Sequence, residues 1–282
     1  MFSPVQTAEP VAATKGWRAA LRLRFSARDA RTYLSERQHT GPLLVQRPFY
    51  PEPNVCHCYI VHPPGGVVGG DDLHIDVRVE PKASALVTTP AAGKFYRSAN
   101  VSAQLSQVFD VQDRACFEWL PQESIYFSGA HVRSQTRVRL ASQARFIGWE
   151  VTCLGLPARH EAFDKGALRL GFELDLEGVP RWLDRLRIDG QSASRTAAWG
   201  LGGFSAIGTM LAYPGTRASL EELRSLREPG VELAFTLVDE VLVCRALSAQ
   251  AEPVRRALVH CWRRLRPSLM GRDAHAPRIW AT

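Results

Sequence analysis

Residues 73–80 read LHIDVRVE, and this stretch decides the fold class of the chain. Its apolar residues occupy every second position, which is the period of a strand that buries one face. The same alternation occurs at 17–25 and 168–176, and shorter runs at 55–61, 83–89, 101–109, 144–154 and 232–243 indicate further strands. Because strands recur at short spacing along most of the chain, we expect a mainly β fold of packed sheets.

Helical signals occur only in the C-terminal third. Ser219 followed by Glu222 matches a capping box, which predicts a short helix near 219–227. A second, amphipathic helix is predicted near 252–266, ended by Pro267, and it either covers a sheet or binds a partner. The glycine-rich segment 200–210 is either a loop or a loosely wound helix. No internal repeat is evident.

Length and composition set the broad class. A chain of 282 residues, 45% of them hydrophobic, can bury a large core. Residues 1–15 lack the features of a signal peptide, so we expect a flexible leader followed by a single domain over 16–282. No apolar run approaches the roughly 20 residues that span a bilayer, and the default expectation is a cytoplasmic protein without membrane contact.

Charge and cysteine content indicate which kind of partner the chain binds and whether its thiols are free. The net charge is +7, but the basic residues are mostly arginines scattered among 28 acids, which argues against nucleic-acid binding. Arginines at interfaces with protein partners fit this pattern better. The six cysteines include no CxxC pair, and we expect free thiols.

A glycine-rich block at 62–72, HPPGGVVGGDD, is the first candidate for a functional loop. It lacks the Lys and Ser/Thr that follow the last glycine of a P-loop, and its spacing does not match GxGxxG. The upstream prolines favour a tight turn between strands. We therefore expect a turn that places Asp71 or Asp72 at a defined point.

Cys56, His57, Cys58 and His62 include ligand types that soft and borderline metals accept. On a strand, however, Cys56 and Cys58 point to one face and His57 to the other, so these three cannot converge on one ion. Buried packing cysteines are the favoured interpretation. His62, at the turn, stays a candidate for a transient metal contact.

An enzyme is the alternative, either an uncharacterised hydrolase or a weak metal-binding enzyme. The chain has no GxSxG elbow, although a Ser–His–Asp triad can assemble in space without a sequence motif. Thr88, Thr89, Lys94 and Tyr96 are either polar site contacts or the exposed face of a strand and its turn.

Long, unusual strings along nearly the whole chain carry a resemblance to a known family. They are GPLLVQRPFYPE at 41–52, YIVHPPGGVVGGD at 59–71, TTPAAGKFYRS at 88–98, WLPQESIYFSGA at 119–130, GWEV and CLGLPA at 148–158, RLRIDG at 185–190 and the terminal PRIWAT. In these strings the chain resembles the urease accessory family UreD, also called UreH. Leu156 stands where the family pattern has an arginine, and Arg159-His160 replace small residues.

The resemblance implies a non-enzymatic scaffold in urease maturation. Members join the accessory proteins UreF and UreG, and the assembly acts on the urease apoprotein, with GTP hydrolysed by UreG. No tightly bound cofactor is implied, and nickel is cargo in transit. The implied fold has stacked sheets with β-helix-like character and two C-terminal helices that contribute to the UreF interface. The missing P-loop agrees with GTP chemistry in a partner.

Nickel in transit must be held weakly, which isolated carboxylates, hydroxyls and waters achieve better than a closed Cys/His cage. The family is thought to offer an internal route for the metal. Asp71, Glu150 and Asp184 lie in or beside the matching strings, and we expect them to line such a route, with Thr88 and Thr89 nearby.

The alternative for these acids is structural. Asp71 would cap a turn and Glu150 would pair with Arg145. Asp184 would pair with its neighbours along the chain, which are Arg181, Arg185 and Arg187.

Overall fold

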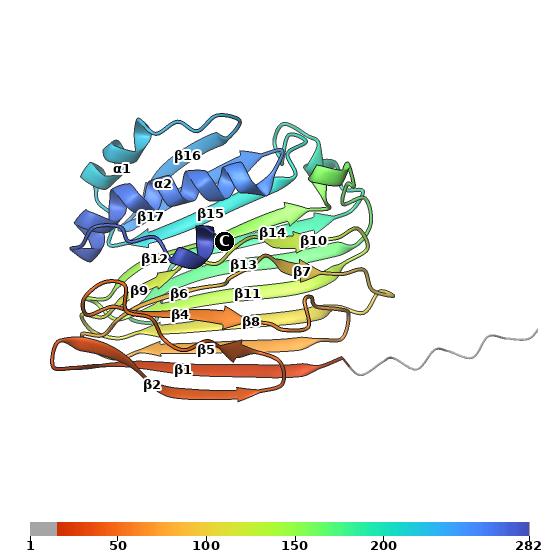
Figure 1. Ribbon diagram of the computed structural model, residues 1–282. Helices are drawn as coiled ribbons and strands as arrows, with labels where there is room; N and C mark the ends of the chain where they lie inside the picture. Colours follow the sequence, from red (N-terminus) through yellow and green to blue (C-terminus); the bar gives the residue numbers. More distant parts are fainter. Residues whose placement is uncertain (1–15, 282) are drawn as a thin grey trace, which may run out of the picture.

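A computed structural model describes residues 16–281 as two β-sheets stacked face to face, with helices against the outer face of one sheet (Figure 1). The mainly β fold class with two C-terminal α-helices is confirmed. The leader predicted at 1–15 lies outside the described residues.

The first sheet has seven strands, and its five central strands pair in parallel. A hairpin strand joins antiparallel at each side. Across the sheet the strands are β14 (Val179–Asp189), β13 (Ala167–Leu176), β11 (His131–Leu140), β8 (Ala103–Val111), β5 (Asp72–Val79), β1 (Arg18–Arg28) and β2 (Arg31–Thr40).

The second sheet has ten strands. Its main path is β16 (Glu232–Val238), β17 (Val241–Ser248), β15 (Ala206–Tyr213), β12 (Arg145–Leu154), β9 (Cys116–Trp119), β6 (Ser84–Thr88), β4 (Cys56–Val61) and β3 (Leu44–Val45). Two short strands branch from it, since β10 (Ser124–Tyr126) pairs with both β12 and β7 (Gly93–Phe95).

Between β4 and β13 the chain winds back and forth between the two sheets. Leaving aside the short β7 and β10, each strand of one sheet is followed by a strand of the other, and successive strands within each sheet pair in parallel. This winding is the coil of a flattened β-helix. It confirms the β-helix-like character that the resemblance implied.

Short turns at one end of the coil repeat a pattern, so the expectation of no internal repeat was wrong. The segments VEPKASA (79–85), VQDRACF (111–117) and LASQARF (140–146) each place a buried alanine four residues after an apolar one. In each turn the alanine N–H donates to the carbonyl three residues earlier. The repeat is hard to recognise in the sequence, because the three turns share only a buried apolar residue and an alanine four residues later. Their other residues differ.

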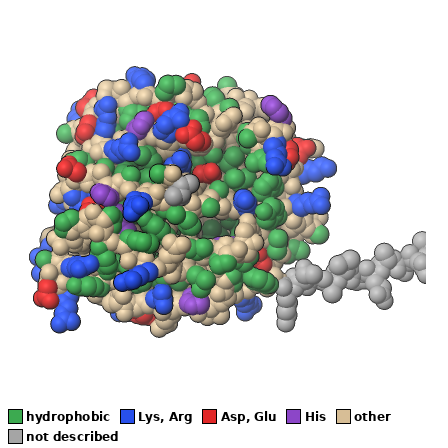
Figure 2. All heavy atoms as spheres, in the orientation of Figure 1, with side chains coloured by type: hydrophobic (Ala, Val, Ile, Leu, Met, Phe, Trp, Pro, Cys, Tyr) green, Lys and Arg blue, Asp and Glu red, His purple; other side chains and the backbone are tan. Residues whose placement is uncertain are grey.

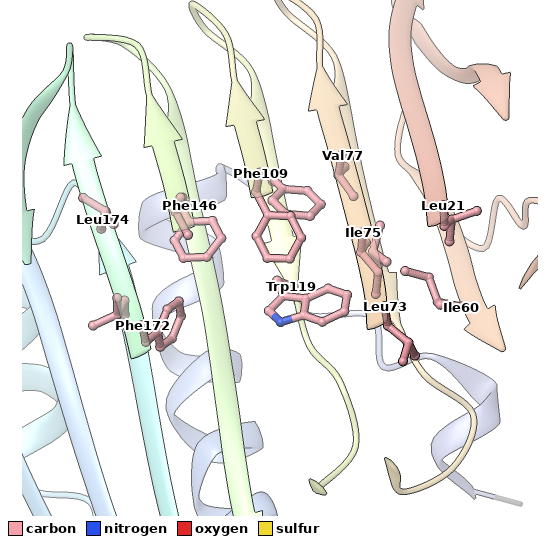
Figure 3. Packing of buried hydrophobic residues seen from close by; sticks show 14 of the residues in the cluster. Leu21, Ile60, Leu73, Ile75, Val77, Phe109, Trp119, Phe146, Phe172 and Leu174 are labelled. Carbon is pink, nitrogen blue, oxygen red and sulfur yellow. The ribbon is translucent and has the colours of Figure 1, made fainter. Parts of the chain in front are cut away.

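The main core fills the space between the sheets. Leu73, Ile75, Val77 and Val79 of β5 are at most 6% exposed, as their alternation predicts. Aromatic rings from neighbouring coils pack on one another, with the Phe109 ring 5.2 Å from Phe117 and 5.0 Å from Trp119 (Figure 3). Burial of every second residue therefore holds the two sheets together.

A second core lies between the ten-stranded sheet and the helices. The long helix α2 (Ala251–Met270) packs on β12, β15 and β17, and α1 (Arg217–Arg224) packs on β16 and α2. Val254, Leu258, Cys261, Trp262 and Leu265 are fully buried, as predicted from the amphipathic pattern. Helix α2 thus covers a sheet face.

The helix boundaries differ from the predicted ones. Thr216 is the N-cap of α1 and Ser219 is its N3 partner, so the helix begins two residues earlier than expected. Pro267 lies inside α2, which ends at Gly271 in the left-handed conformation. The helix continues past the proline because Leu269 and Met270 still bury their side chains.

Two strand assignments also need correction. The run at 232–243 is a hairpin of β16 and β17, turning at Asp239, whose φ is 50°. The segment 200–210 is a loop that becomes β15 at Ala206, not a loose helix. Three short 3-10 helices complete the described elements: Pro157–Arg159, Ala193–Arg195 and Arg278–Ala281.

A buried ion network fastens α2 to the ten-stranded sheet. The fully buried guanidinium of Arg266 donates to Glu118 of β9 at 2.9 Å and to Glu52 at 2.6 Å. The His57 ring also hydrogen-bonds Glu52, and the Trp262 indole N–H donates to Glu118. Burial opposes ionisation of Glu52, but the bonds from His57 and Arg266 lower its pKa to about 2. Glu52 therefore stays charged beneath the helix.

We predict that Arg266→Leu lowers the free energy of unfolding by about 3–5 kcal/mol, because it leaves two buried carboxylates without their cation. Urea unfolding at pH 7 measures the loss. Arg263→Leu is the matched control, since Arg263 is exposed on the same helix and has no ion pair within residues 16–281. A loss below about 1 kcal/mol for Arg266→Leu would show that the network is not needed.

Candidate functional site

A cavity of about 510 Å³ lies between the sheets, at the end of the coil where the connections are long. These connections span 62–71, 89–102, 120–130 and 155–166, whereas the turns at the other end span four residues each, as at 80–83. The walls are mostly apolar, with a few polar groups that include His62, Thr89 and Glu150. Figure 2 shows a recess with apolar side chains around it, near β4 and β7.

One layer of the inter-sheet space is polar where the rest of the core is apolar. In the seven-stranded sheet Gln107 and Thr136 lie side by side, and Asp184 lies in the same row beyond the buried Phe172. In the ten-stranded sheet Glu150, Thr209 and Arg245 lie in register. We call these six residues the polar layer. It extends from β8 to β14 in the seven-stranded sheet and from β12 to β17 in the ten-stranded sheet.

Hydrogen bonds link the polar layer across the two sheets. Gln107 donates to the Thr136 hydroxyl at 2.6 Å, and Thr136 donates to the carboxylate of Glu150 on the opposite sheet. Asp184 pairs with Arg245 at 2.8 Å, and Arg245 also donates to Thr209 at 2.7 Å. Each acid is thus held from the facing sheet.

These contacts correct the pairings expected from sequence neighbours. Glu150 does not pair with Arg145, which points to the other side and donates to the carbonyl of Leu269. Asp184 pairs with none of its neighbours Arg181, Arg185 and Arg187, because it faces the core. Because side chains alternate between the two faces of a strand, residues adjacent to an inward-facing acid, such as Arg185, point away from the core.

The Glu150 carboxyl is the most perturbed acid of the layer. Burial raises its pKa from the ordinary 4.5 to about 7; the bond from Thr136 opposes this, and the negative charge of Asp184 adds to it. Glu150 therefore titrates near neutral pH. A cation that enters the cavity can displace the Glu150 proton to water and bind the carboxylate in its place.

A second, small cavity of about 20 Å³ adjoins the first. Its lining includes Glu150, Thr152, Asp184 and Thr209, and Glu150 and Thr152 line the large cavity as well. The structure therefore brings Glu150 and Asp184 together, as the sequence hypothesis requires. Glu150 stands between the two spaces.

Asp71 lies apart from them. Its carboxylate accepts from the backbone N–H groups of Trp17 at 2.8 Å and Val68 at 2.9 Å, so it caps the glycine turn and fastens β1. Gly70 has φ 92°, and a Cβ at Gly69 would lie 2.4 Å from Ser98, which explains the glycines at these positions. Asp71 is not among the cavity-lining residues.

The two threonines point in different directions. Thr89 lines the cavity and accepts from the N–H of Gln122 at 2.9 Å. Thr88 is fully buried on the outer side of the sheet, where it donates to the carbonyl of Leu120 and accepts from the Trp280 indole at 3.0 Å. Only Thr89 is therefore near the candidate route.

His62 also lines the large cavity. Burial lowers its pKa and the charge of Asp71 opposes that shift, so the ring can offer a neutral nitrogen. Within residues 16–281, no three or more His, Cys, Asp or Glu side chains gather as metal ligands. Cys56 and Cys58 pack in the inner core, while His57 bonds Glu52 on the outer side, which confirms the predicted division of faces.

Four members of the polar layer were not predicted from the sequence: Gln107, Thr136, Thr209 and Arg245. A signal existed, because each is a polar residue in the inward phase of a strand. Gln107, for example, follows Ala103 and Leu105 and precedes Phe109 in the buried phase of β8. A polar residue at such a position needs a partner from the opposite sheet.

We predict that Glu150 makes stability depend on pH. Its raised pKa means that the folded chain holds a proton that the unfolded chain has lost, so the contribution of Glu150 to stability is greatest below pH 4.5 and falls as pH rises to about 7. Glu150→Gln stays neutral and should remove this loss, raising the free energy of unfolding at pH 8 by about 2 kcal/mol relative to the native chain.

Urea unfolding of both chains between pH 5 and pH 8 tests this prediction. The control is Glu161→Gln, whose side chain is exposed in the connection after β12. Parallel stability curves for the native chain and Glu150→Gln would contradict the assignment.

Comparisons with known proteins match nearly the whole length of the chain. The family model described as UreD urease accessory protein matches residues 18–281. A Pseudomonas putida KT2440 protein is 44% identical over 268 residues, covering 95% of each chain. A Pseudomonas entomophila protein is 42% identical, covering 100% of each, and one from Alkalilimnicola ehrlichii is 43% identical, covering 99% of this chain and 96% of its own.

Each of these relatives bears the name urease accessory protein UreD, which denotes an accessory protein and not an enzyme. No helix among residues 16–281 is long and apolar enough to cross a membrane. The match to the family model and the identity along the full chain show that this chain belongs to the UreD family of urease accessory proteins.

Proposed function

We propose that this chain is a cytoplasmic scaffold of urease maturation that passes nickel toward the urease apoprotein. It would act in a complex with the accessory proteins UreF and UreG, with GTP hydrolysed by UreG. Nickel is the cargo of the reaction and not a resident cofactor.

The observation that carries the proposal is the position of Glu150 between two adjoining cavities. A single carboxylate with a pKa of about 7, lined up with hydroxyl groups, binds a divalent ion weakly and releases it readily. A storage site would instead need several ligands around one point. The polar layer therefore suits passage.

The described contacts support an order along this route. His62 and Thr89 lie at the large cavity, Glu150 lies between the two spaces, and Asp184 lies at the small one. Asp184 pairs with Arg245, and its negative charge is one cause of the raised pKa of Glu150. Asp71 contributes by fixing the turn that follows His62.

The outer face of the C-terminal helices suits a partner interface. Helix α2 uses one face on the sheet and leaves residues such as Arg263 exposed without an ion pair in the described chain. Exposed arginines are enriched in protein interfaces. This arrangement supports the proposed contact with UreF.

We predict that Glu150→Ala lowers nickel loading of urease by about tenfold or more, because the carboxylate between the two cavities is lost. Asp184→Ala should lower it as well, by about threefold, since it leaves Arg245 as an unpaired positive charge beside the route. Asp71→Ala should act through stability alone. Nickel content and urease activity after co-expression with the partner proteins measure the effect.

The matched control is Asp113→Ala, which removes an acid from a turn at the opposite end of the coil. Each variant must still co-purify with UreF, so that a lost complex is not mistaken for a blocked route. Full nickel loading by Glu150→Ala and Asp184→Ala together would refute the passage.

A further inference from the structure

The outer face of the seven-stranded sheet is highly charged, and over most of it the charges pair across strands. Arg22 lies opposite Asp76, Arg137 opposite Glu173, and Arg139 opposite Asp110 and Asp175. Where Arg24 lies opposite Arg78, Glu80 bridges the two and Glu36 pairs with Arg24. Opposite charges in neighbouring positions stabilise a sheet, and like charges destabilise it.

One corner of this face breaks the pattern. Arg133 of β11 lies directly opposite Arg169 of β13, which lies opposite Arg187 of β14. Arg185 lies on β14 two residues before Arg187, opposite Gly171. We call these four arginines the arginine corner. It sets three like charges side by side in one row.

The carboxylates near the arginine corner do not neutralise it. Asp189 contacts Arg169 at 3.0 Å and Arg187 at 3.2 Å, so one acid serves two cations. Glu173 lies 3.7 Å from Arg185 but is shared with Arg137. Arg133 is exposed and makes no ion pair within residues 16–281.

A depression lies over the same corner. It has a volume of about 510 Å³, and its lining includes all four arginines together with Gln104 and Gln135. Its one acid, Asp72, lies beyond Gln104 at the edge and pairs with His74 at 2.9 Å. The Gln135 amide lies over Gly171, where a Cβ would come within 2.1 Å of it, so the glycine lets this amide lie flat in the floor of the depression. Its volume falls in the range of sites that bind extended or drug-sized ligands, about 300–1,000 Å³.

We propose that the arginine corner docks an acidic segment of a protein partner. Carboxylates of such a segment would complete the row of arginines, and guanidinium groups bind carboxylates in a bidentate way. The amides of Gln104 and Gln135 would bind the backbone of the segment. The contact lies on the side opposite α2, so it goes beyond the helix interface of the proposed function.

Charge distribution favours this occupant over a nucleic acid. A nucleic acid duplex carries a charge about every 1.7 Å and would extend over the neighbouring rows, where Asp110, Glu173 and Asp175 would repel it. A short acidic segment fits within the corner. The depression is also larger than a single small anion needs.

Fluorescence anisotropy of a labelled oligo-glutamate peptide with the full chain at low salt tests the proposal. Arg133→Glu and Arg185→Glu should each weaken peptide binding about tenfold, as expected for loss of a charge-assisted contact with added repulsion. Arg22→Glu is the matched control, with the same charge change on the same exposed face, and should alter binding by about twofold or less.

Three results would overturn the docking site. The first is no peptide binding, or an equal loss in Arg22→Glu, which would mean general attraction to a basic protein. The second is full displacement of the peptide by inorganic phosphate at the same charge concentration, which would mean a small-anion site. The third is tighter binding of single-stranded DNA with the same sensitivity to Arg133→Glu.

Discussion

The structure depends on one constraint: in every coil, alternate residues must point into the space between the two sheets. The chain crosses from one sheet to the other between successive main strands, so the inner positions of each strand meet those of the facing sheet. Burial of these apolar positions supplies the main stabilisation. The constraint also sets the turns, because a small residue such as Ala83, Ala115 or Ala144 must lie where the chain changes sheets.

The same constraint explains why the candidate site is recognisable. An inward position that carries a polar side chain must find its partner across the core, and the polar layer does so through Thr136 and Glu150 and through Arg245 and Asp184. Such a layer costs stability relative to an apolar core. Its position beside the inter-sheet cavities is the physical link between the fold and the proposed passage of nickel.

The outward positions divide into surfaces with different roles. On the ten-stranded sheet they meet α2, where Arg266 holds Glu52 and Glu118 in a buried network. On the seven-stranded sheet they face solvent, and their charges match across strands except at the arginine corner. The molecule thus has an inner space shared by the two sheets and two outer faces. Helix α2 covers the outer face of the ten-stranded sheet, and the outer face of the seven-stranded sheet carries charges that are not fully balanced.

The sequence by itself determined the β class, most strand positions, the two helices and the family, because alternation and long distinctive strings are local properties. It also indicated Glu150 and Asp184, as acids within apolar stretches. Tertiary structure alone decided their partners, since Thr136 and Arg245 come from the facing sheet and are distant in the chain. It likewise assigned Asp71 to a turn and turned Thr88 away from the cavity. Register between strands, which no local pattern encodes, fixes which inward and outward side chains meet.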